Sequence, residues 1–158
     1  VENTRHPIVG LMARAWGAYP VRRGEVDRRA IASTLELMRQ GRAVLLAPEG
    51  TRHPYLRDAK HGMAYLATKG GATVVPVGLD GTDRFPRTLL RLRRTPVTVR
   101  FGVPFRFRTS GERRVERDTL HTMTQEAMYQ LAALLPEHRR GAYHDLSRAT
   151  TDTLQFLG

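Results

Sequence analysis

The chain has 158 residues, of which 41% are hydrophobic, and its formal net charge is +11. This length and composition predict one domain with a buried core, and the positive charge predicts attraction to phospholipid headgroups, nucleic acid or phosphorylated substrates. The absence of cysteine excludes disulfides, thiolate metal sites and cysteine catalysis, and no apolar run of about 18 residues is present to span a bilayer.

The first part of the chain predicts alternating helices and strands. Apolar residues at helical spacing predict a helix over residues 2–16, and residues 19–22 have the character of a short strand. A second helix is expected to start after a cap at Asp27 and to end at Gly41. Residues 43–47 form the next apolar run and predict a strand. This strand, helix, strand order predicts a right-handed crossover between parallel strands.

The middle of the chain predicts one more helix and two more strands. Residues 62–69 predict a short helix. Residues 73–79 are apolar and β-branched without alternation, which is typical of a strand covered on both faces. Residues 97–107 predict another strand, with a bend or bulge at Gly102 and Pro104.

Two helical segments are expected near the end. A long helical pattern over residues 112–135 is limited by Pro136, and residues 145–157 predict a short helix that packs late. The order of the elements predicts the α/β class, with a mostly parallel sheet flanked by helices. No internal repeat is present, so residues 1–158 are expected to form a single domain.

Residues 84–94 alternate apolar residues with five arginines. A basic amphipathic segment of this kind can lie at an anionic membrane surface. The alternative is a solvated basic face that is packed by its own leucines. The sequence leaves both interpretations open.

A polar motif, PEGTR at residues 48–52, follows the apolar run 43–47 without a spacer. Ligands bind at such corners in open α/β sheets because the sheet fixes the backbone while the side chains face a crevice. Arg52 can hold a phosphate through two hydrogen bonds, Gly50 lets a substrate approach the backbone, and Glu49 and Thr51 can bind hydroxyls. The motif therefore suits a phosphorylated polyol, and a polar turn with a salt bridge is the alternative.

Residues 48–52 resemble the third sequence block of the glycerolipid acyltransferases, the family of 1-acylglycerol-3-phosphate acyltransferases. Residues 17–23 resemble the second block and residues 74–78 resemble the fourth, in the same order and at the same spacing. In that family, arginines of the second and third blocks hold the substrate phosphate. The resemblance therefore implies that Arg23 and Arg52 bind one phosphate, and a surface ion pair is the alternative for Arg23.

Lys60 precedes a predicted helix start and can add positive charge to the same phosphate site. His61, next to it, is a plausible acid or base near a phosphate, and an exposed loop histidine is the alternative. His53 and Asp58 have the spacing of the family's catalytic pair but follow Glu49, so we interpret that spacing as coincidence. No spacing of zinc ligands is present in the sequence, so no metal is implied. No nucleophile elbow is present either, so the serines are not candidate nucleophiles.

The resemblance implies an acyltransferase, similar in fold to glycerol-3-phosphate acyltransferase, that acts in phospholipid biosynthesis. The acceptor would be lysophosphatidate or a related glycerolipid, the donor acyl-CoA or acyl carrier protein, and no cofactor is implied. The family's catalytic base comes from a first block, a His and an Asp separated by four residues. That block is not found ahead of Glu49. We therefore expect the catalytic pair upstream of Val1, a domain truncated at its amino terminus, and no activity from these 158 residues alone.

We expect a cytoplasmic protein that binds peripherally to the anionic inner face of the cell membrane. The absence of cysteine fits a reducing cytoplasm. The rival hypothesis is a non-enzymatic basic module that binds nucleic acid or anionic lipid. Aromatic residues make up 7% of the chain and are not interleaved with the basic ones as a base-stacking platform requires, which makes a nucleic-acid partner unlikely.

Overall fold

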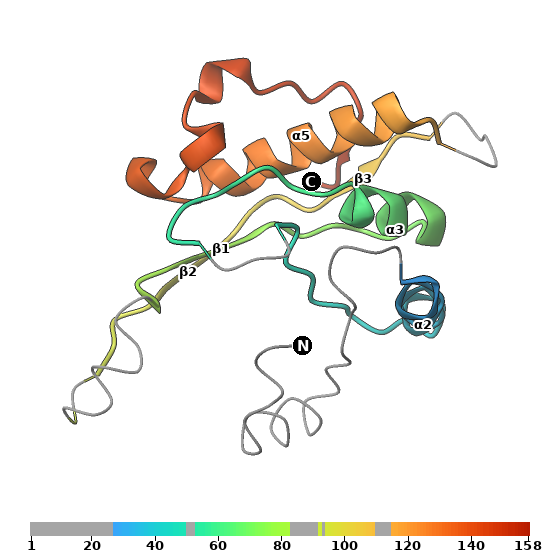
Figure 1. Ribbon diagram of the computed structural model, residues 1–158, viewed down its shortest axis with the longest axis horizontal. Helices are drawn as coiled ribbons and strands as arrows, with labels where there is room; N and C mark the ends of the chain where they lie inside the picture. The colour runs from blue at the N-terminus through green and yellow to red at the C-terminus, as the bar shows by residue number, and fades with distance from the viewer. Residues whose placement is uncertain (1–26, 50–52, 83–91, 93, 110–114) are drawn as a thin grey trace. The chain divides into compact units, whose positions relative to one another are not determined.

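The computed structural model describes residues 27–49, 53–82, 92, 94–109 and 115–158. The chain divides into two compact units, Val1–Leu45 and Leu46–Gly158, and each is described by itself. The described residues form a mixture of helices and short strands (Figure 1), so the predicted α/β composition is confirmed. Both sheets of the described part are two-stranded and antiparallel, and no parallel sheet is seen there.

Helix α2 (Arg28–Arg39) starts and ends where the sequence predicts. The Asp27 carboxylate accepts hydrogen bonds from the backbone amides of Arg29 and Ala30 at 3.1 and 3.0 Å. These bonds satisfy two of the amides that every helix start leaves unpaired. At the other end, Gly41 takes the left-handed conformation with a φ of 72°, which glycine adopts without steric cost. The predicted cap and stop are both confirmed.

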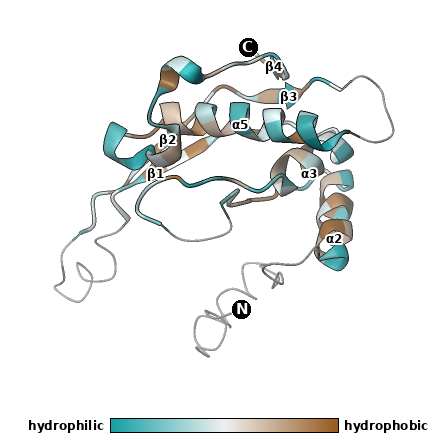
Figure 2. Cartoon of the chain, turned by 45° about the horizontal axis from the view of Figure 1, so that its top comes forward, coloured by the Kyte–Doolittle hydropathy of each residue, from teal (hydrophilic) through white to brown (hydrophobic). Residues whose placement is uncertain are grey.

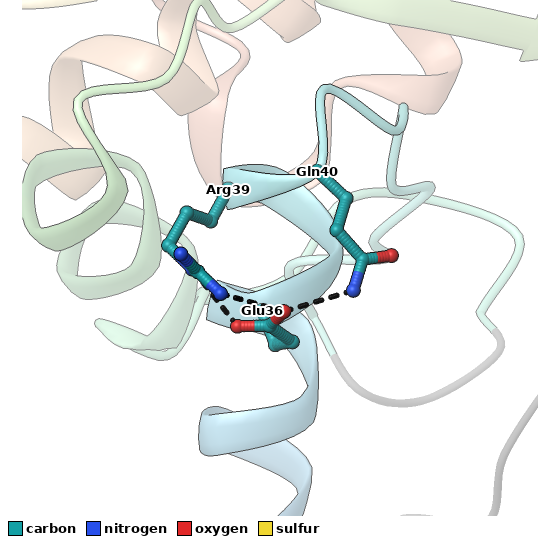
Figure 3. A network of polar contacts seen from close by, with 3 residues as sticks. All are labelled: Glu36, Arg39 and Gln40. Carbon is teal, nitrogen blue, oxygen red and sulfur yellow. Dashed lines mark hydrogen bonds and ion pairs between the residues drawn. The ribbon is translucent and has the colours of Figure 1, made fainter.

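The solvent side of α2 carries a small polar network (Figure 3). The Arg39 guanidinium donates to both carboxylate oxygens of Glu36 at 3.0 Å, and Gln40 adds a third hydrogen bond at 2.8 Å. The bonds from Arg39 and then Gln40 lower the pKa of Glu36 below its ordinary value. The side chains of Arg39 and Glu36 are 78% and 47% exposed, so water screens the pair and it adds little to stability.

The prediction of a strand over residues 43–47 is wrong, because residues 42–47 form neither helix nor strand. Val44 and Leu46 are 36% and 38% exposed, and Leu45 is 96% exposed. A strand is built from hydrogen bonds to a neighbouring strand, and none of the described strands pairs with this run. The predicted helix over residues 2–16 and the predicted strand over residues 19–22 lie outside the described residues.

Helix α3 (Gly62–Gly70) confirms the helix predicted over residues 62–69. Its buried face consists of Ala64 and Ala67, which are 0% and 6% exposed. Small side chains at these positions allow the helix to approach its neighbours α5 and β3 closely. The helix ends at Gly71, which has a φ of 58° in the left-handed region.

Strand β1 (Val77–Asp80) pairs in antiparallel register with β2 (Thr98–Phe101). The register places Leu79 opposite Val99 and Val77 opposite Phe101. Gly78 faces the end of α5, where a methyl group on this glycine would lie 2.8 Å from Cβ of Leu134. Its lack of a side chain therefore allows the sheet and the helix to pack together.

Among the described residues, the other face of this sheet is exposed, which corrects the prediction that residues 73–79 form a strand covered on both faces. Only residues 77–79 of that range belong to the strand, and Val74 adds a single bridge to Phe105. Most of the large apolar side chains along this sheet are exposed, and hydrophobic colour appears along β1 and β2 (Figure 2). A non-alternating apolar sequence therefore does not distinguish a strand covered on both faces from one with an open apolar face. The exposed apolar residues in and beside β1 and β2 are Val75, Leu79, Val97, Val99, Phe101 and Val103.

The single strand predicted over residues 97–107 is instead two strands in different sheets, because β2 ends at Phe101 and β3 (Phe105–Phe107) begins after Gly102 and Pro104, where the sequence predicts a bend or bulge. Strand β3 pairs in antiparallel register with β4 (Leu154–Phe156). The phenylalanines of β3 are 0% and 8% exposed and belong to a core cluster shared with α3, α5 and β4. The buried members are Ala64, Ala67, Phe105, Phe107, Met123, Ala127 and Leu154.

The prediction of a helix over residues 145–157 is wrong apart from one 3-10 turn, η5 (Leu146–Arg148). The carboxylate of Asp145 caps this turn by accepting a hydrogen bond from the amide of Ser147 at 3.1 Å. The later residues form β4 because Phe105–Phe107 offers a strand edge to pair with. Tertiary pairing of this kind overrides local helical spacing.

Helix α5 (Arg117–Ala133) is the long helix predicted ahead of Pro136, and it crosses the unit in contact with α3, β1 and β4 (Figure 1). Two 3-10 turns follow it, η3 (Glu137–Arg139) and η4 (Gly141–Tyr143). They return the chain against α5 and close a second core cluster. Its buried members are Leu56, Met128, Tyr129, Ala132, Leu135 and Tyr143.

Glu126 lies on α5 and is only 1% exposed. It accepts hydrogen bonds from the hydroxyl of Thr150 at 2.7 Å, the amide of Asp152 at 2.8 Å, and the amide of Thr153 at 2.9 Å. The Thr153 hydroxyl donates a fourth. Burial raises the pKa of this carboxyl, but the four hydrogen bonds together outweigh burial and hold the pKa below its ordinary value. The carboxylate therefore ties the chain ahead of β4 to the middle of α5.

Candidate functional site

The loop of residues 48–60 carries the described part of the predicted site. Its two ends meet, because the Lys60 amide donates to the carbonyl oxygen of Pro48 at 3.2 Å. A second bond runs across the loop, from the Arg57 amide to the Oε1 atom of Glu49 at 2.6 Å. Glu49 and Lys60 thus both lie where the two ends of this loop meet, and we call this place the loop neck.

Of the six predicted substrate-binding residues, the structure describes only Glu49 and Lys60. It brings them to the same loop neck. Arg23 lies outside the described residues, and so do Gly50, Thr51 and Arg52. The predicted convergence of two arginines on one phosphate therefore stays a prediction.

Arg57 is a loop residue that the sequence analysis did not single out. Its amide donates to Glu49, and its Nη1 atom lies 3.2 Å from Nε2 of His53. Among the described residues, the polar contact of His53 is thus with Arg57 and not with Asp58, and its ring also lies near that of Tyr55, with centroids 6.4 Å apart. The only sequence signal was that Arg57 is a basic residue between the PEGTR motif and Lys60.

The middle of the loop is anchored by Leu56, which is 6% exposed in the second core cluster. Its backbone amide donates to the carbonyl oxygen of Arg139 at 2.8 Å, and its own carbonyl oxygen accepts from the Ala142 amide at 3.1 Å. Tyr143 packs in the same cluster, where burial raises the pKa of its phenol, so this group stays protonated at neutral pH. The loop is therefore held from its middle as well as at its neck.

Lys60 directly precedes the start of α3, where His61 takes the cap position without a side-chain cap. The uncapped amides and the helix dipole at such an end favour an anion. The His61 ring lies edge-on to that of His121, with centroids 5.5 Å apart, and its Nδ1 atom is 3.5 Å from Oγ1 of Thr124. His61 is half-buried between α3 and α5, so it is not the fully exposed loop histidine of the alternative interpretation.

Other potential sites in the described residues do not coincide with this loop. No cluster of three or more metal-ligating side chains occurs among the residues that the structure describes. A hollow of about 250 Å³ is lined by residues around the start of α5 and the turn before β4, and none of them belongs to residues 48–60. Its lining is Arg108, Thr109, Val115, Glu116, Thr119, Met123, Asp152 and Thr153.

A carboxylate and a lysine at the neck of a loop, next to a helix start, can hydrogen-bond hydroxyl groups and attract an anion. The sequence profile of the Acyltransferase family matches residues 2–80, which include this whole loop. The chain belongs to the Acyltransferase family. The predicted resemblance is confirmed at this level.

The chain is also similar to individual 1-acyl-sn-glycerol-3-phosphate acyltransferases. It is 34% identical over 88 residues to a chloroplastic enzyme of Arabidopsis thaliana, and the aligned region covers 52% of this chain and 24% of that protein. Identity to a chloroplastic enzyme of Brassica napus is 33% over 88 residues, which are 52% of this chain and 25% of that protein. Identity to the enzyme of Borreliella burgdorferi is 33% over 85 residues, which are 51% of this chain and 34% of that protein.

The matched part of the chain thus spans only about a quarter to a third of these relatives. No solved structure is significantly similar to the chain. A membrane-spanning helix requires about 20 mainly apolar residues, and none of the helices in the described part of the chain meets that requirement.

Proposed function

We propose that this chain is part of an acyltransferase that moves a fatty acyl group from an acyl thioester to a hydroxyl of lysophosphatidate or a related glycerolipid. Family membership and the similarity to 1-acyl-sn-glycerol-3-phosphate acyltransferases support this reaction class. The observation that carries the proposal is the loop neck, where the Lys60 amide is bonded to Pro48, the residue before Glu49, directly ahead of the start of α3. Family membership also favours an enzyme over a non-enzymatic basic module.

The proposed chemistry is direct transfer. The acceptor hydroxyl loses its proton to a histidine base, and its oxygen bonds to the thioester carbonyl carbon. The carbon–sulfur bond then breaks, and the protonated histidine returns the proton to the leaving sulfur, which releases the thiol of coenzyme A or acyl carrier protein. The His and Asp pair that the family resemblance implies is not present ahead of Glu49 in these 158 residues. We therefore expect transfer only from a protein that also contains that pair.

The residues of this chain would bind and orient the acceptor. Two arginines would hold its phosphate through bidentate hydrogen bonds, and a lysine beside a helix start would add charge. Glu49 would accept a hydrogen bond from an acceptor hydroxyl and so fix its position for attack. The full proposed set is Arg23, Glu49, Gly50, Thr51, Arg52 and Lys60.

Two broader features belong to the same proposal. The first is a single domain with a mostly parallel sheet flanked by helices, as in the glycerol-3-phosphate acyltransferase fold. The second is peripheral binding to the anionic inner face of the cell membrane through residues 84–94. Leu92 belongs to that segment and is 96% exposed. Pelleting with anionic vesicles, compared with a gel shift on nucleic acid at several salt concentrations, separates this proposal from the nucleic-acid alternative.

The phosphate site is tested by Arg52→Lys in the complete natural protein. Lysine keeps the charge but loses the bidentate geometry, so the KM for lysophosphatidate should rise by about tenfold to a hundredfold while the KM for the acyl donor stays unchanged. Arg148→Lys is the matched control, because Arg148 is exposed in η5 and lies outside the proposed site. An equal effect of Arg52→Lys on donor and acceptor would show that Arg52 does not hold the acceptor phosphate.

A further inference from the structure

Arg139, at the end of η3, joins three segments that are far apart in the sequence. Its Nε atom donates to Oδ1 of Asp80, the last residue of β1, at 3.0 Å. Its Nη1 atom donates to the carbonyl oxygen of Pro54 at 2.9 Å, and its own carbonyl oxygen accepts from the Leu56 amide at 2.8 Å. One residue therefore connects the end of a strand to two points on the loop of residues 48–60.

The turn after Arg139 fits against the same part of the loop. The Ala142 amide donates to the Leu56 carbonyl oxygen, so both backbone polar groups of Leu56 are bound to the segment 139–142. Gly141 has a φ of 50°, and a methyl group on it would lie 2.0 Å from the Leu56 oxygen. The glycine thus allows the two backbones to approach this closely.

The loop depends on these bonds because residues 53–60 form neither helix nor strand of their own. An irregular segment keeps its position only through contacts with rigid neighbours. Here the neighbours are β1, through Asp80, and the end of α5, through η3 and η4. The family match ends at residue 80, so the segment 139–142 lies beyond it.

We propose that Arg139 is a positioning residue for the acceptor site, which fixes residues 53–60 by linking Pro54 and Leu56 to Asp80. This inference rests on the proposed function for its kinetic consequence. The side chains of Arg139 and Asp80 are 18% and 27% exposed, so water screens this pair less than a fully exposed one. A planar guanidinium can donate to Asp80 and Pro54 at once, whereas an ammonium group lacks this fixed fork.

Hydrogen–deuterium exchange of the complete natural protein tests the positioning without an activity assay. Arg139→Gln should speed exchange in peptides that cover residues 53–60 by about tenfold, since the loop then opens more often. Arg139→Lys should give an intermediate rate. Arg148→Gln removes one charge from the same carboxyl-terminal segment and should leave the loop unchanged. Exchange in the loop that is equal in Arg139→Gln and the wild type overturns the inference, whatever the activity.

Kinetics test the consequence for the acceptor site. Arg139→Gln should raise the KM for lysophosphatidate by about tenfold and leave the KM for the acyl donor within about twofold, since a displaced loop misplaces only the groups it carries. Asp80→Asn should act in the same direction, and the double variant should be less than additive because the two side chains form one pair. Arg139→Lys should recover part of the loss.

The outcomes separate this inference from the proposed function. If Arg139→Gln lowers the melting temperature but leaves the acceptor KM unchanged, Arg139 is only a structural residue and the inference is wrong. If the complete wild-type protein transfers no acyl group, the proposed function is wrong, and the exchange measurement still decides whether Arg139 holds the loop. If Arg139→Gln does not fold, Arg139→Lys decides by the same two measurements.

Discussion

Glu49 and Glu126 both accept hydrogen bonds from backbone amides, but the chain surrounds them in different ways. Glu126 is 1% exposed, and four donors from the chain ahead of β4 occupy its two oxygens. Glu49 is half-buried in a loop and accepts one hydrogen bond from the described residues, from the Arg57 amide. A carboxylate whose acceptor positions are filled by its own chain stabilises the fold, whereas one that accepts a single bond from the described residues is a candidate to bind a ligand as well.

The two glutamates also differ in what their removal should change. Glu126 holds residues 150–153 against α5, so its loss should weaken folding. Glu49 accepts a hydrogen bond across its loop, and Lys60, in the same loop, directly precedes the start of α3. The loss of Glu49 should therefore mainly alter ligand binding. This contrast can be tested by making the same chemical change, glutamate to glutamine, at both positions.

The largest effect is expected from Glu126→Gln. Glutamine has the same shape, but one of its terminal atoms is a donor and would face groups that also donate, including the amides of Asp152 and Thr153. We expect the free energy of unfolding to fall by about 3 kcal/mol, because hydrogen bonds to a buried charge are lost and donors are left unpaired. Chemical denaturation measures the change, with Glu137→Gln in exposed η3 as the control. A loss no larger than that of the control would show that Glu126 does not anchor the chain ahead of β4.

The second prediction concerns pH. The folded state holds the pKa of Glu126 below the ordinary value of 4.5, so the unfolded state binds this proton more readily. The stability that Glu126 provides is therefore present above about pH 4.5 and is lost as the pH falls through the pKa of the folded state. A hydrogen bond from Arg39 likewise lowers the pKa of Glu36, and hydrogen bonds from Ser147 lower the pKa of Asp145.

The comparison of variants isolates the contribution of Glu126. Between pH 6 and about pH 3, the melting temperature of the wild type should fall more steeply than that of Glu126→Gln, since glutamine does not titrate. Glu36 and Asp145 remain in both proteins and cancel in the difference. Parallel pH profiles for the two proteins would mean that Glu126 is held no more favourably in the folded state than in the unfolded one.

The elements that the sequence predicts well are those set by local chemistry. The cap at Asp27, the stop at Gly41, the end of α3 before Gly71 and the interruption of the strand at Gly102 each depend on a residue and its immediate neighbours. Strand pairing depends on partners that are distant in the chain. The pairing of Phe105 with Phe156 joins two such partners, and no local pattern reveals it.

The candidate site follows the same division. Sequence analysis placed Glu49 and Lys60 in one site through the motif and the predicted helix start, and the structure brings both to one loop neck. Sequence analysis missed Arg57, because its role arises from a hydrogen bond across the loop. It also missed Arg139, because this residue lies more than 80 positions from Pro54, to which it donates a hydrogen bond. The strand predicted over residues 43–47 failed for the related reason that a strand needs a partner.

The smallest effect on stability, and the sharpest test of the comparison, is expected from Glu49→Gln. The glutamine carbonyl can still accept the hydrogen bond from the Arg57 amide, so the unfolding free energy should change by less than about 1 kcal/mol. If Glu49 binds an acceptor hydroxyl as we propose, loss of its charge should raise the KM for lysophosphatidate by about tenfold and leave the donor KM unchanged. Glu137→Gln again serves as the control and should change neither quantity. Should Glu49→Gln destabilise the protein as strongly as Glu126→Gln and leave the acceptor KM unchanged, Glu49 only closes its loop, and the two carboxylates do the same structural work.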